Sequence, residues 1–80
     1  MARNPKLEAL LVARWEAEQC APAEKPAKFE VVRRLAEAAL IEAGRNPTGW
    51  RALVAATQSE YWVFRAERLK EQMRRLSRLR

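Results

Sequence analysis

The last 31 residues of this 80-residue chain, positions 50–80, contain neither glycine nor proline. As one unbroken α-helix they would be about 46 Å long, because each helical residue adds about 1.5 Å. A globule of this size has a radius of gyration of about 12 Å and a diameter of about 30 Å. The segment must therefore either break or project far beyond the core. Ser59 is a favourable N-cap residue, so a break near residues 58–59 would give four helices in place of three.

The N-terminal quarter of the chain is predicted to be helical as well. Asn4 and Pro5 form a favourable helix start, with asparagine as the N-cap and proline in the first turn. Leucines then recur at helical spacing, which predicts a helix over residues 5–19. Residues 20–27 contain two prolines, which is typical of a linker.

A second helix is expected over residues 27–43, because Gly44 supplies a left-handed C-cap position. Its apolar face is broader than a helix with one neighbour needs, and its alanines would let another backbone approach closely. A turn follows, and a third helix is expected over residues 48–80, with or without the break. We therefore predict one all-α domain over residues 1–80, a small three- or four-helix bundle with a long basic C-terminal helix.

The predicted core consists of apolar residues that recur at helical spacing along all of these segments. They are Leu7, Leu10, Leu11, Trp15, Phe29, Val32, Leu35, Ala39, Leu40, Trp50, Leu53, Val54, Tyr61 and Phe64. Near residues 61–64 the apolar stripe of the C-terminal segment rotates by roughly 130° around the helix axis. The two halves of the segment are therefore expected to face different neighbours.

The second half of that stripe has the spacing of a helix–helix contact. Trp62, Leu69, Met73 and Leu76, with Ala66 between them, alternate by four and three residues and form what we call the seam. Such a narrow a/d pattern suits a single partner helix. Trp62, Leu69, Met73 and Leu76 are accordingly the predicted partner interface.

The positive charge of the chain is concentrated in the same segment. Residues 65–80 carry seven positive and two negative charges, which accounts for +5 of the total charge of +6. A concentrated basic helix suits nucleic acid, an anionic membrane, an acidic protein surface or plain solubility. The charges surround most of the helix, however, and Glu67 and Glu71 can pair with basic neighbours one turn away. The pattern is typical of a solvated helix with a positive bias.

The residue types that are missing argue against an enzyme. The chain has no histidine and no aspartate, so the usual base near neutral pH is absent and no Ser–His or Cys–His pair can form. Its single cysteine, Cys20, cannot complete a zinc site of about four ligands. We expect no catalytic residue, cofactor, metal or small-molecule substrate. A lone cysteine and the lack of a visible targeting segment predict a cytoplasmic protein.

Two functional hypotheses follow from these patterns. The first is a small non-enzymatic helical adaptor that binds a protein partner, or a second copy of itself, through the seam. The alternative is a nucleic-acid-associated regulatory factor. Its expected phosphate contacts are Arg65, Arg68, Arg74, Arg75 and Arg78. A membrane surface is the weakest candidate, because the seam is narrow and glutamates dilute the charge.

Overall fold

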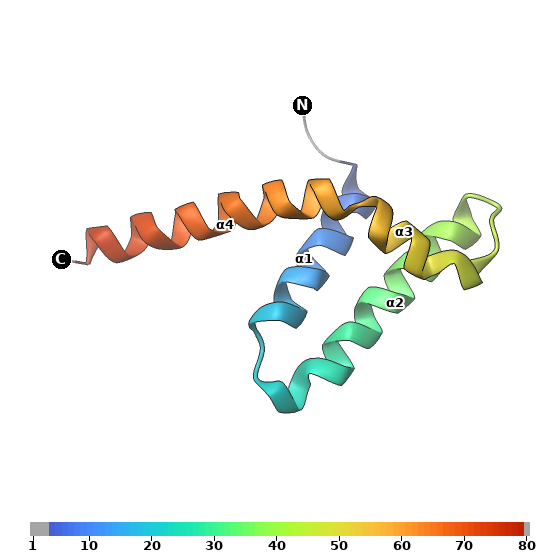
Figure 1. Cartoon of the computed structure of the whole chain (residues 1–80), viewed down its shortest axis with the longest axis horizontal. Coiled ribbons are helices and arrows are strands. Elements are labelled where there is room, and N and C mark those ends of the chain that lie inside the picture. The colour runs from blue at the N-terminus through green and yellow to red at the C-terminus, as the bar shows by residue number, and fades with distance from the viewer. Residues whose placement is uncertain (1–3, 80) are drawn as a thin grey trace.

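The computed structural model describes residues 4–79 of the chain. Within this range it is built from α-helices and short 3-10 turns, and it contains no strand. The elements are α1 (Pro5–Gln19), η1 (Pro22–Glu24), α2 (Lys25–Glu42), η2 (Pro47–Gly49), α3 (Trp50–Ala56) and α4 (Gln58–Arg78). The all-α prediction is confirmed, in its four-helix form and with a long basic C-terminal helix (Figure 1).

Helices α1 and α2 form an antiparallel pair, and each end of α1 has its own cap. At the start, the Asn4 side chain accepts a hydrogen bond from the backbone N–H of Lys6 at 2.8 Å. At the end, Nζ of Lys25 donates to the carbonyl oxygens of Ala17 and Glu18 at 3.1 and 3.0 Å. A cation is favourable at a helix C-terminus, where carbonyl groups have no partner within the helix. Lys25 therefore ties the start of α2 to the end of α1.

Alanines form much of the contact between α1 and α2. Ala17 and Ala36 have no exposed surface, and Ala13 is almost as completely buried. Because alanine side chains are small, the two backbones approach closely and bury Leu10 and Val32 beside them. Sequence reasoning anticipated the close approach but left Ala13, Ala17 and Ala36 out of the predicted core.

Apart from Leu40, the buried residues form two clusters on two sides of α1. The first lies between α1 and α2, and Trp50, Leu53 and Val54 of α3 pack against it. The second joins Leu11 of α1 to Tyr61 and Phe64 of α4. The remaining predicted core residues are buried or half-buried, with one exception.

That exception is Phe29, which was predicted to be in the core and is 52% exposed. It lies in the N-terminal half of α2, whereas α3 runs beside the C-terminal half (Figure 1). The apolar face of α2 therefore extends beyond the helix that covers it, and the prediction for Phe29 is wrong for that reason.

The long C-terminal segment breaks at Thr57, next to the expected position. The Thr57 N–H lies 3.2 Å from the carbonyl oxygens of both Leu53 and Val54, and its hydroxyl donates to Val54 O at 2.8 Å. Such back-bonding of a threonine hydroxyl bends helices. Thr57, and not Ser59, occupies the N-cap position of α4, and its side chain makes no capping hydrogen bond.

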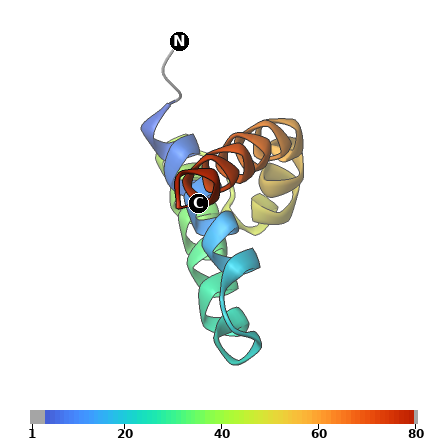
Figure 2. The same cartoon turned by 90° about the vertical axis from the view of Figure 1, so that its left-hand side faces the viewer.

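Helix α4 also projects beyond the bundle. The C-terminal segment, which was expected either to break or to project, therefore does both. Its 21 residues span about 31 Å, and only its first turns lie against α1 and α3. Figure 1 shows the rest leaving the bundle, and Figure 2 shows the same helix from its C-terminal end. The radius of gyration is accordingly 14.3 Å and the longest dimension 50 Å.

Candidate protein-interaction surfaces

The base of α4 is fixed to α1 by polar contacts around Tyr61, which is 4% exposed. The Tyr61 hydroxyl donates to the Glu18 carboxylate, and Nε of Arg65 lies 2.9 Å from the other Glu18 oxygen. The guanidinium of Arg14 lies 4.0 Å from the centre of the Tyr61 ring, a cation–π contact, and donates to Gln58 Oε1 at 3.0 Å. The direction in which α4 leaves the bundle is therefore set by α1.

These contacts shift the pKa values of Tyr61 and Glu18 in opposite directions. Burial and the adjacent Glu18 carboxylate raise the pKa of Tyr61 to about 12. The hydrogen bond from Tyr61, helped by Arg65, lowers the pKa of Glu18 despite its partial burial. Each shift favours a neutral phenol that donates to a charged carboxylate over a wide range of pH.

Of the predicted interface residues, Trp62 lies at this base, and Leu69, Met73 and Leu76 lie beyond it along α4. Trp62, Met73 and Leu76 are 53, 68 and 65% exposed, and Leu69 is half-buried. Leu79, which directly follows α4, is 83% exposed and extends the apolar surface toward the C-terminus. Sequence reasoning did not include Leu79, although it follows Leu76 by three residues.

The structure divides the five predicted phosphate contacts between two places on α4. Arg65 and Arg68 lie near the base, where Arg65 pairs with Glu18 and Arg68 lies 4.8 Å from the Phe64 ring centre. Arg74 and Arg75 lie 3.8 and 3.5 Å from Glu71 on the projecting part, and Arg78 is in the last turn. The five side chains therefore do not form one continuous basic patch.

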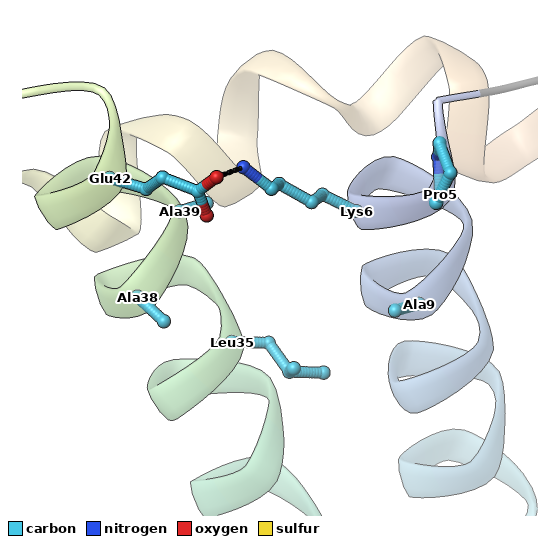
Figure 3. A pocket seen from close by; sticks show the side chains of 7 residues that line it. All are labelled: Pro5, Lys6, Ala9, Leu35, Ala38, Ala39 and Glu42. Carbon is cyan, nitrogen blue, oxygen red and sulfur yellow. Dashed lines mark ion pairs between the residues drawn. The ribbon is translucent and has the colours of Figure 1, made fainter.

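A second apolar surface, which sequence reasoning missed, lies between α1 and α2 (Figure 3). Leu35 projects from α2 toward α1, and Lys6 forms an ion pair with Glu42 across the opening. The other residues that line this part of the surface are Pro5, Ala9, Ala38 and Ala39. Farther along α1 the lining continues with Glu8, Val12, Ala13, Glu16 and Val31. We call this surface the α1–α2 groove.

One sequence feature could have indicated the groove. The apolar face of α2 was broader than one neighbouring helix needs, and its excess width now lies in the groove. Leu35 and Ala39 belong to that face and line the groove. The angle between α1 and α2, which opens the groove, depends on packing and has no local sequence signal.

Among residues 4–79, no cluster of three or more potential metal-ligating side chains was found. No helix in this part of the chain combines the length and the hydrophobicity that crossing a bilayer requires. No family model matches the chain, and no curated protein or solved structure matches it.

Proposed function

We propose that this chain is a small non-enzymatic interaction module that binds a protein partner, or a second copy of itself, through the seam of α4. The observation that carries the proposal is the exposure of Trp62, Met73 and Leu76 on a helix whose base is held firmly by α1. An exposed apolar row of this kind on a small protein is a usual mark of an interaction site.

The form of the surface favours a helix or a helical groove as the partner. Helix-in-groove recognition uses apolar anchors at intervals of three and four residues, which is the spacing of Leu69, Met73 and Leu76. Trp62 adds a large aromatic side chain near the base, and tryptophan is enriched among the residues that dominate binding energies. Because α4 is already helical, little conformational entropy would be lost on binding.

The arginines of α4 support a nucleic-acid partner less well. Arg65 is engaged with Glu18, and Arg74 and Arg75 share Glu71, so phosphate binding would compete with existing ion pairs. Exposed pairs of this kind are worth about 1 kcal/mol or less, and phosphates could displace them. Nucleic-acid binding is therefore the competing outcome in the experiment below.

The experiment is affinity capture with and without nuclease, using three forms of the protein. In the seam variant, Leu69→Glu and Met73→Glu place charge in the apolar row. In the charge variant, Arg74→Gln and Arg78→Gln remove positive charge and leave the row intact. The proposal expects a protein that is captured despite nuclease, is lost with the seam variant and is kept with the charge variant. Capture that requires nucleic acid and fails only with the charge variant would establish the alternative.

A further inference from the structure

We propose that the partner of the seam is the α1–α2 groove of a second copy of this chain, so that the protein self-associates through two different surfaces. This inference rests on the proposed function, because it assigns an occupant to the same seam. Three features of the described residues carry it: the shape of the groove, the distribution of charge, and the rigid path of α4.

The groove has the size and lining that the projecting end of α4 needs. Its lining alanines, which include Ala9, Ala38 and Ala39, are small and leave room for larger side chains between the helices. From Pro5 to Glu16 the groove follows α1 for 12 residues, or about 18 Å. Leu69, Met73 and Leu76 span about 11 Å along α4, so all three fit within that length.

Charge distinguishes the groove from a second α4 as the partner. Residues 69–78 carry four positive charges and one negative charge. Two α4 helices packed along their seams would bring these positive charges side by side, and like charges in contact are unfavourable. The groove, by contrast, is lined by Glu8, Glu16 and Glu42, and among residues 4–79 its one basic lining residue is Lys6, which pairs with Glu42. The groove is therefore the electrostatically complementary surface.

The path of α4 excludes the groove of its own chain. Leu11, which packs against Tyr61 and Phe64 of α4, and Ala9, which lines the groove, point about 160° apart on α1. From Gln58 to Arg78 helix α4 has no glycine or proline at which it could turn back, and Figure 1 shows it leading away from α1 and α2. Only another molecule can place its seam in the groove.

Reciprocal exchange would form this contact twice. In a two-fold dimer, each α4 would occupy the groove of the other copy, and the buried area would be double that of a single helix in a groove. Doubling brings such a contact toward the roughly 1,200–2,000 Å² that stable protein interfaces bury. A closed two-fold arrangement is also the commonest form of self-association.

The first test is sedimentation of the full-length chain over a range of concentrations. We expect a dimer that dissociates on dilution, and at least a tenfold weaker association for Ala38→Arg, which places a positive charge in the groove. The matched control is Ile41→Arg on the same helix, because Ile41 is 62% exposed and does not line the groove. A monomer at every concentration, or equal weakening by both substitutions, would overturn the inference.

The second test asks which surfaces meet. In a Cys20→Ser background, one variant carries Ala38→Cys in the groove and the other carries Met73→Cys in the seam. We expect that oxidation of the mixture gives mainly the disulfide between the two different variants. If the Met73→Cys variant instead cross-links mainly to itself, α4 pairs with α4 and the groove is not its partner. If the chain is monomeric but the nuclease-resistant capture still depends on the seam, the proposed function stands and only self-association fails.

Discussion

The hydroxyl of Tyr61 donates a hydrogen bond to the carboxylate of Glu18, which joins the first turn of α4 to the last turn of α1. Arg65 holds the other oxygen of the same carboxylate at 2.9 Å, and Arg14 lies against the face of the Tyr61 ring. Four side chains thus connect two helices that are more than 40 residues apart in the sequence. The direction in which α4 and its seam project from the bundle depends on this connection.

We expect Tyr61→Phe to lower the free energy of unfolding by about 1 kcal/mol. A hydrogen bond to a charged group contributes about 1.5–3 kcal/mol, and the Glu18 side chain, which is 37% exposed, can recover part of that from water. Phenylalanine keeps the ring beneath Arg14, so the substitution isolates the hydroxyl. Urea unfolding of the two proteins measures the difference. An unchanged unfolding midpoint would show that the hydroxyl contributes nothing to the attachment of α4.

The chain has one tyrosine, so the ionisation of Tyr61 can be followed directly. We expect ultraviolet absorbance of the phenolate to give a pKa of about 12 in the folded protein, against the ordinary 10.0 once the chain is unfolded in denaturant. Because the folded-state pKa is raised, the stabilisation is fully present below pH 10 and is lost as the pH rises toward 12. A folded-state pKa close to 10 would contradict the buried, carboxylate-bound phenol.

Acid should weaken the same connection from the side of Glu18. Its pKa is lowered in the folded protein, first by the hydrogen bond from Tyr61. The stabilisation is therefore present above the ordinary value of 4.5 and is lost as the pH falls through the lowered folded-state pKa. We expect Glu18→Gln to remove part of the loss of stability below pH 4.5, which acid unfolding followed by circular dichroism would measure. An identical acid dependence in the variant would assign the loss to other glutamates.

The two phenylalanines provide a direct comparison of exposed and buried sites. Phe64 is 2% exposed. Phe64→Ala should lower the free energy of unfolding by about 3–5 kcal/mol, because removing a large core side chain leaves a cavity. Phe29 is 52% exposed, so Phe29→Ala should change the free energy of unfolding by about 0.5 kcal/mol or less. Chemical denaturation of both variants tests the pair. A large cost at Phe29 would mean that a partner or a second copy covers it in solution.

Local signals in the sequence were sufficient for most of the helix positions. The Asn4–Pro5 start and the Gly44 stop act within one turn of the chain, and the structure has helix ends beside both. The break at Thr57 lay one residue outside the expected range, because the Thr57 hydroxyl bonds back to Val54 O and no side-chain cap fixes the start of α4. Local chemistry therefore defines the helices but places their ends only approximately.

The arrangement of the helices was harder to predict. Phe29 has the spacing of a core residue, and its exposure depends on how far α3 reaches along α2. The groove arises from the angle between two helices, which depends on packing and which no local pattern in the sequence predicts. The seam, by contrast, could be named from the sequence, because rotation of an apolar stripe is a property of one helix.

The two glycines of the chain occupy different backbone conformations. Gly44 has φ of +73° and closes α2, where its N–H and that of Arg45 bond back to the carbonyl groups of Ile41 and Leu40. This is the Schellman arrangement, and a left-handed residue there favours glycine. Gly49 has φ of −78°, which alanine adopts without strain.

Gly44→Ala should therefore destabilise the protein by about 1–2 kcal/mol through backbone strain alone, since a Cβ at this position would meet no atom within 4 Å. Gly49→Ala should instead be neutral or stabilise by up to about 1 kcal/mol, because its Cβ would lie at an ordinary 3.9 Å from Leu40 and the unfolded chain would lose freedom. Thermal unfolding of the two variants and the original protein measures both changes in stability. Equal effects at both positions would contradict a left-handed cap at the end of α2.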